Sequence, residues 1–378
     1  MFDYETLRFI WWVLIGVLLV GFAVTDGFDL GVGALVPILG KTDTERRVMI
    51  NTIAPHWDGN QVWLVTAGGA LFAAWPLVYA TSFSGFYLAM MVALVTLWLR
   101  PVGLDYRSKI EDKKWRTNWD RCISISGFVP PIIFGVAFGN LLQGVPFNLD
   151  EFLIPTYHGS FFGLLNPFAL LCGVISLLMF LLQGTTWLQM KTTHKLYTKS
   201  RRLSQVLGLV LTVAFVAAGF WIQHIDGYVI TSVMNHSADS DPLGKTVIRE
   251  AGAWMTNFHT YPKLWAAPLL GVLMPLFAVL ASRFNKSGLA FLASSLANAG
   301  VIATAGIAMF PFVMPSSLDP SHSLTMWDAT SSKLTMQIIT MVAFVMVPVI
   351  VAYTSWTYYK MFGRVDNQYI EQNKTSAY

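Results

Sequence analysis

The sequence contains few charged residues. Only 12% of its 378 residues are Asp, Glu, Lys or Arg, about half the share found in a typical soluble domain. So few charges do not cover the surface of a soluble protein, and a disordered chain would be far more polar. Cysteine is also scarce: Cys122 and Cys172 allow at most one disulfide and fit no metal-site spacing. The composition therefore excludes a soluble domain and a disordered chain.

Several sequence signatures are missing as well. There is no Walker loop and no dinucleotide fingerprint in a strand–helix unit, so we expect neither an ATPase nor a dehydrogenase. We also expect no cleavable signal peptide. Asp3 and Glu5 precede the first apolar run, which is longer than a signal sequence and lacks a cationic start. This run is predicted to be a retained membrane helix.

Apolar residues are abundant and occur in long blocks. Hydrophobic residues make up 54% of the chain, aromatic residues 14%, and the mean hydropathy is +0.54. Strands of a membrane β-barrel would instead alternate in short segments. The pattern predicts an all-α polytopic membrane protein. Each spanning helix needs about 20 mainly apolar residues, and nine segments meet this requirement: 9–37, 52–76, 79–101, 121–145, 161–190, 204–223, 264–282, 288–312 and 334–358.

The nine segments are expected to form a single membrane domain, residues 1–378. We expect the second and third spans to be separated by a tight turn at Pro76. Within the domain we expect a first helix bundle in 9–145, a second in 161–312 and a last transmembrane helix at 334–358.

Basic residues predict the orientation, because Lys and Arg accumulate in cytoplasmic loops. With the N-terminus in the periplasm, twenty of the 25 basic residues fall on the cytoplasmic side, including the seven from Arg100 to Arg121 and Lys374. Five fall on the other side: Arg8, Lys245, Arg249, Lys263 and Lys333. Nine spans then place the C-terminus in the cytoplasm.

Three acidic residues fall inside the predicted spans. Asp26 and Asp29 lie three apart on one face of the first helix, and Asp58 lies early in the second. At about 1.5 Å per residue, Asp29 lies roughly 30 Å from the outer start of its helix, and Asp58 about 9 Å inside the cytoplasmic boundary. Arg100 ends the third span at this depth, and His56 is two residues before Asp58. Depth therefore predicts one inner-leaflet cluster of these five residues.

Two interpretations of this cluster remain open. Membrane carboxylates with a histidine are typical of the mouth of a proton-uptake path. Alternatively, Arg100 forms a buried ion pair with an Asp and only locks three helices together. The segment 54–63, APHWDGNQVW, is too polar to face lipid throughout, so it must meet another helix, water or a second subunit.

A haem group bound by this chain alone is not expected. Axial haem ligands in a membrane bundle are usually His, Met or Cys side chains on facing helices. His56 is the only histidine inside a predicted span, and it lies near the start of that span. We therefore expect no haem ligand and no metal site in this chain.

Several long motifs are similar to those of a known family, and the similarity extends from end to end. The sequence resembles subunit II of the cytochrome bd-type quinol oxidases, through RFIWW (8–12), TDGFDLGVG (25–33), APHWDGNQVWL (54–64), AGGALFAAWPLVYA (67–80), RPVGLDYRSK (100–109), FVPPIIFGVAFGNLLQGVPF (128–147), GIAMFPFVMPSS (306–317) and SLTMWDATSS (323–332).

The resemblance implies a terminal oxidase of the bacterial inner membrane that oxidises quinol, reduces oxygen to water and generates a proton-motive force. It implies that haem b558, haem b595 and haem d are held mainly or wholly by a partner, subunit I. Small single-helix subunits and a structural quinone are further expectations. The resemblance also implies a proton route that starts near Asp58, and it associates Trp63 with oxygen access.

These expectations assign a role to each candidate residue. Asp58 and His56 relay protons, Asp29 and Asp26 assist, and Arg100 tunes their charge. A proton-coupled secondary transporter would also use buried carboxylates, and a purely scaffolding subunit would use them only for assembly. Both remain alternatives from the sequence alone.

Overall fold

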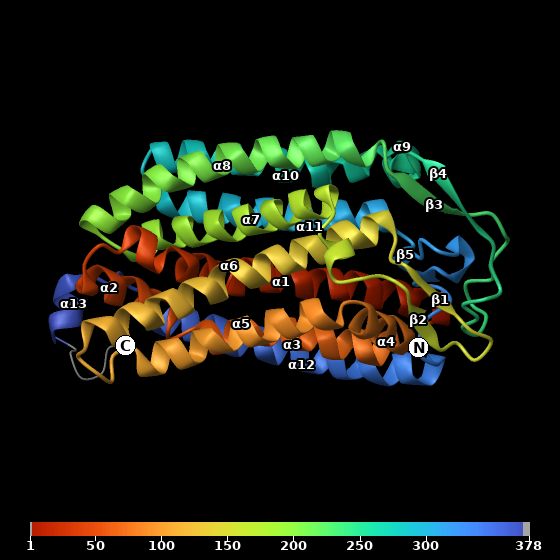
Figure 1. The fold of residues 1–378 in the computed structure, drawn as a ribbon, viewed down its shortest axis with the longest axis horizontal. Coiled ribbons are helices and arrows are strands. Elements are labelled where there is room, and N and C mark those ends of the chain that lie inside the picture. The colour runs from red at the N-terminus through yellow and green to blue at the C-terminus, as the bar shows by residue number, and fades with distance from the viewer. Residues whose placement is uncertain (1, 373–378) are drawn as a thin grey trace.

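The computed structural model describes residues 2–372. Long helices run side by side along one axis, and the first and last described residues lie at opposite ends of the molecule (Figure 1). In the described range, eight helices are long and apolar enough to cross a membrane. The expected all-α polytopic fold is confirmed. Lys374, one of the basic residues used above, lies outside the described residues.

The helices follow the apolar blocks of the sequence. They are α1 (Tyr4–Leu39), α2 (Asp43–Ile53), α3 (Trp57–Ala74), α4 (Pro76–Gly85), α5 (Tyr87–Tyr106), α6 (Lys113–Gln143), α7 (Pro167–Lys191), α8 (His194–Ile222), α9 (Thr256–Thr260), α10 (Ala266–Arg283), α11 (Ser287–Met309), α12 (Lys333–Lys360) and α13 (Asn367–Gln372). Short 3₁₀ turns lie at Phe162–Leu164, Ala253–Met255, Pro262–Trp265 and Pro320–His322.

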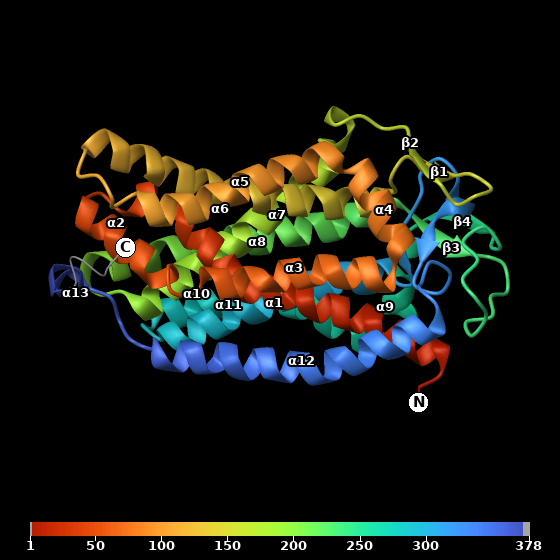
Figure 2. The ribbon, with the colours of Figure 1, turned by 90° about the horizontal axis from the view of Figure 1, so that it is seen from below.

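The predicted second span differs most from the structure. Residues 52 and 53 belong to α2, and α3 begins at Trp57 after a break in the helix. With Asp58, Asn60 and Gln61 in its first turns, α3 is not among the eight apolar helices in the described range. It nevertheless runs beside the long helices (Figures 1 and 2).

Pro76 ends α3 as expected, but no tight turn follows. Trp75 is both the C-cap of α3 and the N-cap of α4, and Pro76 occupies the first position of α4, where its missing N–H is tolerated. α4 crosses the end of the bundle, and a second break at Phe86 leads into α5 (Figure 2). The predicted third span, 79–101, therefore begins at the fourth residue of α4, and the long helix is Tyr87–Tyr106.

Polar caps explain why several helices begin before the apolar segment. Asp3 accepts a hydrogen bond from the Thr6 amide at the start of α1, and Asp112 does the same for Trp115 at the start of α6. A side-chain oxygen at this position satisfies an amide that has no partner in the helix. As a result, both helices begin before their predicted spans, with first turns that contain charged residues.

α1 lies at the centre of the molecule. It packs against α3, α6, α7 and α11, which belong to both of the predicted bundles. Gly31 permits the approach of α7, because a Cβ at this position would collide with the carbonyl oxygen of Phe180. Small residues at such crossings let helix backbones come close together in membranes.

Three antiparallel hairpins lie at the end that carries the N-terminus (Figure 1). The strands are short, and all of them lie between the predicted spans except that Phe312 is the last residue of the predicted span 288–312. Phe147 pairs with Tyr157, Asp226 with Ala251, and Phe312 with Thr325. The strands are β1 (Phe147–Leu149), β2 (Pro155–Tyr157), β3 (Asp226–Ile230), β4 (Val247–Ala251), β5 (Phe312–Met314) and β6 (Leu324–Thr325).

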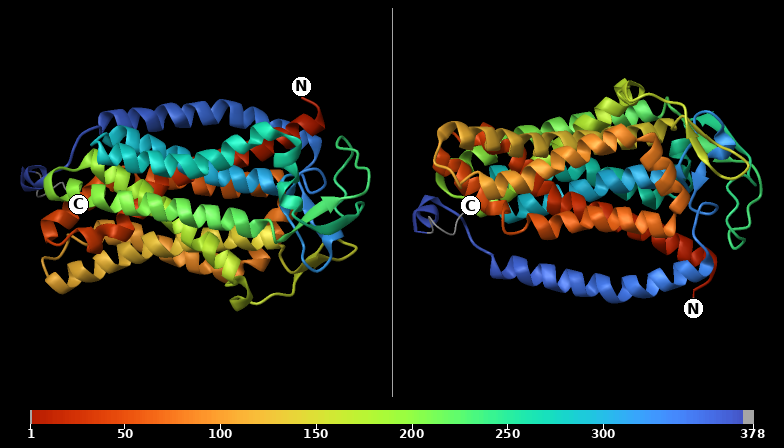
Figure 3. Two further views of the ribbon diagram at one scale, coloured as in Figure 1. Left: turned by 90° about the horizontal axis from the view of Figure 1, so that it is seen from above. Right: turned by 60° about the horizontal axis from the view of Figure 1, so that its bottom comes forward.

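α12 runs along one edge of the bundle and stands apart from most other helices (Figure 3). Of its residues, Met336 and Thr340 are buried. Near the N-terminal end of the molecule, the Trp11 indole donates to Thr340 Oγ1 over 2.8 Å. Near the other end, Tyr358 reaches into the bundle, and this contact forms part of the candidate site.

Candidate functional site

A buried ion pair joins α1 to α5. Arg100 Nη1 donates to Asp26 Oδ1 over 2.7 Å, and neither side chain is exposed. Arg100 Nη2 also donates to Gln61 Oε1 of α3 over 3.1 Å. Removing one partner of such a pair leaves an uncompensated buried charge, which is strongly destabilising. The contact therefore ties together three helices, as the structural interpretation of the cluster expects.

Asp29 lies one turn further along α1 and is also fully buried. Its Oδ2 accepts from Asn60 Nδ2 over 2.7 Å, and Asn60 Oδ1 accepts from the Tyr358 hydroxyl over 2.5 Å. Asp29 Oδ1 is buried without a hydrogen-bond partner among the described residues. A line of polar groups therefore runs from α12 through α3 to a carboxyl oxygen that remains available.

His56 lies beside this line in an aromatic environment. It is the N-cap residue of α3, where its side chain makes no capping bond, and it is buried. Its ring stacks on Tyr358 with centroids 4.5 Å apart and meets the edge of Trp187 at 6.1 Å. Tyr358 thus contacts His56 with its ring and Asn60 with its hydroxyl.

Asp58 does not join the buried groups. Its side chain is exposed, whereas Asn60 is buried. Two residues on a helix differ by about 200° in direction, so the inward position of Asn60 turns Asp58 outward. It shares the outer face of α3 with Val62, Val65 and Phe72, all of which are exposed. The prediction of a single five-residue cluster is therefore wrong in the placement of Asp58.

Trp63 lies between α3 and α1. It is partly buried, and its ring fills the space beside Gly21, where a Cβ would lie within 3 Å of the indole. This position is a helix-packing contact. The association of Trp63 with oxygen access stays a prediction.

Asn60 and Tyr358 are not among the site residues predicted from the sequence. Asn60 gave a signal, because an amide early in a membrane helix requires a partner. Tyr358 gave none, since it lies 298 residues from Asn60 in the sequence. Only the packing of α12 on α3 brings the two together.

The histidines bear on whether this chain holds a haem. All seven lie within the described range, and of these only His56 is buried. Its ring faces aromatic side chains, and no second buried histidine is present in residues 2–372 to face it. The described residues therefore do not fit a haem held between two histidines.

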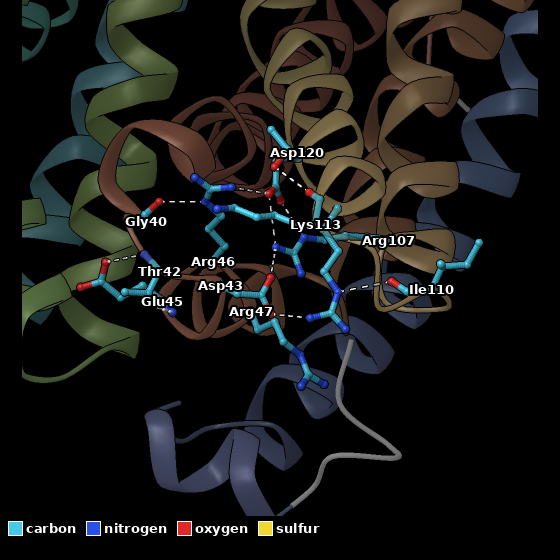
Figure 4. Close-up of polar contacts among 12 residues, drawn as sticks. Gly40, Thr42, Asp43, Glu45, Arg46, Arg47, Arg107, Ile110, Lys113 and Asp120 are labelled. Atoms are coloured by element: carbon cyan, nitrogen blue, oxygen red, sulfur yellow. Dashed lines mark hydrogen bonds and ion pairs between the residues drawn. The ribbon is translucent and has the colours of Figure 1, made fainter.

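A second polar cluster closes the end of the molecule opposite the N-terminus (Figure 4). Asp120 of α6 is fully buried and accepts from Arg46 at 2.8 Å and from Arg107 at 2.6 Å. Asp43 accepts from Arg107 and Arg116, both at 2.8 Å. Burial alone would lower the pKa of Arg107, but the two carboxylates outweigh it and raise that pKa. The cluster holds α2 against the ends of α5 and α6.

The other end is held by two buried cations. Arg8 of α1 donates to Thr330 Oγ1 at 2.9 Å and to the His236 carbonyl at 2.6 Å. Lys245 pairs with Asp328 at 2.9 Å, and both are buried. Burial raises the pKa of Asp328, and Lys245 opposes that shift. These contacts anchor the long connection between β3 and β4 to the start of α1.

Comparisons with known proteins agree with the resemblance seen in the motifs. The family model for cytochrome bd terminal oxidase subunit II matches residues 7–361. The chain is 62% identical to cytochrome bd-I ubiquinol oxidase subunit 2 of Escherichia coli, over all of both chains. It is 58% identical to a probable cytochrome oxidase subunit 2 of Haemophilus influenzae, again over all of both.

A more distant relative and a solved structure extend the comparison. The chain is 31% identical to cytochrome bd ubiquinol oxidase subunit 2 of Bacillus subtilis, over 96% of this chain and 98% of the relative. The fold matches a chain of the bd oxidase from Geobacillus thermodenitrificans with a TM-score of 0.69 at 14% identity, covering 95% of this chain and 100% of the other. The chain therefore belongs to the cytochrome bd terminal oxidase subunit II family, and it is a multi-pass inner-membrane subunit of a respiratory terminal oxidase.

Proposed function

We propose that this chain completes a quinol:oxygen oxidoreductase by supporting a haem-bearing subunit I and by guiding cytoplasmic protons toward it. The observation that carries the proposal is the placement of Asp58, a carboxylate on the otherwise apolar outer face of α3. A carboxylate facing lipid at this depth is unfavourable. A partner subunit that covers this face with polar groups would remove that penalty and would place Asp58 at the subunit interface.

In this proposal the two sides of α3 do different things. Asp58 takes a proton at the cytoplasmic end and passes it along the interface with subunit I. On the inner side, Asp29 can hold a proton on its free Oδ1, with its other oxygen fixed by Asn60. His56 supports this arrangement through Tyr358, and Asp26 with Arg100 holds α1 and α5 in place.

The haems belong to subunit I in this proposal. When bound there, haem b558, haem b595 and haem d supply quinol oxidation and oxygen reduction. The described histidines support this assignment, because His56 has no facing partner that would complete a haem site. Small single-helix subunits, bound quinol and a structural quinone belong to the same proposal.

The proposed orientation places the Arg46–Arg107–Asp120 cluster in the cytoplasm and the three hairpins in the periplasm. It is supported by the basic residues, which gather at the end opposite the N-terminus. A fluorescent protein that requires a cytoplasmic environment, fused after Tyr378, should be bright. The same protein fused before Met1 should be dark.

The proton proposal is tested by Asp58→Asn and Asp29→Asn in the assembled complex. Loss of a relay group should slow quinol-dependent oxygen consumption by about 10²- to 10⁴-fold while the haem spectrum is unchanged. Glu111→Gln is the matched control, because Glu111 is an exposed carboxylate in the connection between α5 and α6, at the same end of the molecule.

The outcomes separate the proposal from the scaffold alternative. If Asp58→Asn turns over normally, the relay is excluded. If haem is lost together with activity, the residue acts in assembly, as the scaffold alternative expects.

A further inference from the structure

A basic groove lies beside the first turns of α8, away from the candidate proton site. It has a volume of about 450 Å³ and is lined by His194, Lys195, Thr198, Lys199 and Arg202. A second groove of about 380 Å³ shares His194 and is lined by Thr193, Tyr197, Asn285, Ser287 and Arg364. No carboxylate lines either groove.

The charges in the first groove are only partly neutralised. Lys199 pairs with Glu45 at 3.1 Å and also donates to the Leu39 carbonyl. Lys195 and Arg202 are exposed and have no hydrogen-bond or ion-pair partner among the described residues. The groove therefore retains two free cations. Thr193 makes no side-chain capping bond, so the first amides of α8 add further positive character.

The basic side chains continue an apolar stripe on α8. Residues 195, 199, 202, 206, 209 and 213 follow helical spacing, so they lie on one face. On this face Val206, Leu209 and Val213 are exposed and apolar, whereas Arg202, Lys199 and Lys195 are basic. The opposite face carries most of the buried residues of α8, which pack toward α7 and α10: Ser200, Ser204, Leu207, Gly208 and Leu211.

We propose that this face of α8 binds an anionic phospholipid. The lipid belongs to the leaflet at the end of the molecule where α8 begins. The acyl chains lie along Val206, Leu209 and Val213, and the phosphodiester lies in the groove between Lys195, Lys199 and Arg202. The change from apolar to basic at Arg202 matches the change from acyl chain to headgroup in a lipid. Binding of a soluble anion would account for the basic side chains. It would give the apolar half of the stripe no part in binding.

The test uses the assembled complex in phosphatidylcholine nanodiscs that contain a little photo-crosslinkable phosphatidylglycerol. After illumination, digestion and mass spectrometry locate the labelled peptides. We expect label on residues 193–213. In the Lys195→Gln/Arg202→Gln variant, the amount of this label should fall by a factor of roughly ten or more. The matched control is Lys114→Gln/Arg121→Gln, which removes an exposed Lys and an exposed Arg with the same seven-residue spacing on α6. Its label on α8 should be unchanged.

Four results would overturn the proposal. Equal labelling by a phosphatidylcholine probe would mean that only the apolar face is recognised. Loss of label in the α6 control would mean that charge at this end acts as a whole. Competition by inorganic phosphate would show a site for soluble anions. If the Gln double variant does not assemble, the single variants Lys195→Gln and Arg202→Gln take its place, and unchanged label in both would overturn the proposal.

Discussion

Asn60 donates a 2.7 Å hydrogen bond to Asp29 and so fixes one oxygen of a carboxyl group in the middle of the bundle. The same amide accepts the Tyr358 hydroxyl, which makes Asn60 the junction between the first, second and last long segments of the chain. The polar residues in the first turns of α3 keep this helix out of the set of most apolar helices. Inside the protein, Asn60 among them forms hydrogen bonds with two other helices. The role of Asn60 follows from its two hydrogen-bond partners, Asp29 and Tyr358.

Tyr358→Phe tests this junction. The substitution removes only the hydroxyl, so the ring still stacks on His56, but the buried Asn60 Oδ1 loses its donor. We expect a loss of about 1–3 kcal/mol in the stability of the complex, measured as a lower temperature of thermal unfolding. An unchanged unfolding temperature would show that this bond does not hold α12 to the bundle.

The Asp26–Arg100 pair predicts a difference between single and double variants. Arg100→Leu leaves Asp26 as a lone buried carboxylate, and we expect a loss of about 3–5 kcal/mol. Adding Asp26→Leu removes the remaining charge and should restore much of the yield of assembled complex. Haem absorbance per amount of purified protein measures assembly. Equal yields of the single and double variants would contradict this explanation.

Gly31 and Gly16 form a matched pair on α1. Alanine at position 31 collides with the Phe180 backbone of α7, whereas a Cβ at position 16 has nothing within 4 Å. Gly31→Ala should therefore destabilise the protein by about 1–3 kcal/mol through overpacking, while Gly16→Ala should have little effect. The unfolding temperatures of the two variants decide the matter, and similar values would contradict the predicted close crossing.

Glu45 predicts a dependence on pH. Burial would raise its pKa, but hydrogen bonds from the Lys41 amide and the ammonium of Lys199 outweigh this and hold the pKa below its usual value. Because the folded pKa is lowered, this contribution is present above the ordinary value near 4.5 and is lost as the pH falls through the folded pKa.

The variant Glu45→Gln should therefore lower stability by up to about 1 kcal/mol at pH 7, as expected for a partly exposed ion pair. The difference from the unmodified protein should shrink toward zero below pH 4.5. Thermal unfolding at pH 7 and at low pH measures both values. A constant difference would mean that the charge of Glu45 does not contribute.

Hydropathy predicted the long helices well because each spanning helix must contain its own run of apolar residues. It was less accurate at the ends. The caps of α1 and α6 add charged turns, and Trp75–Pro76 leads into α4 where a tight turn was expected. The hairpins were missed because their strands are short, two to five residues each, and hydropathy reports only the long apolar runs.

For the site, the spacing of residues along one helix predicted which side chains share a face. The depth of residues on different helices was a poorer guide to which side chains meet. Asp26 and Asp29 share a face because they are three residues apart, and Arg100 reaches the first of them as its depth suggested. Depth does not determine the direction in which a side chain points, so Asp58 was grouped with residues from which it is turned away. The contribution of Tyr358 required the three-dimensional structure.

The central position of α1 has a consequence for how the protein is made. Asp26 enters the membrane early, yet Arg100 follows 74 residues later in the chain. At a synthesis rate of about 5–20 residues per second, that interval is roughly 4–15 seconds. During this time Asp26 lacks its partner, so the unfinished chain needs another polar contact for this carboxyl group, from water or from the insertion machinery, until α5 arrives.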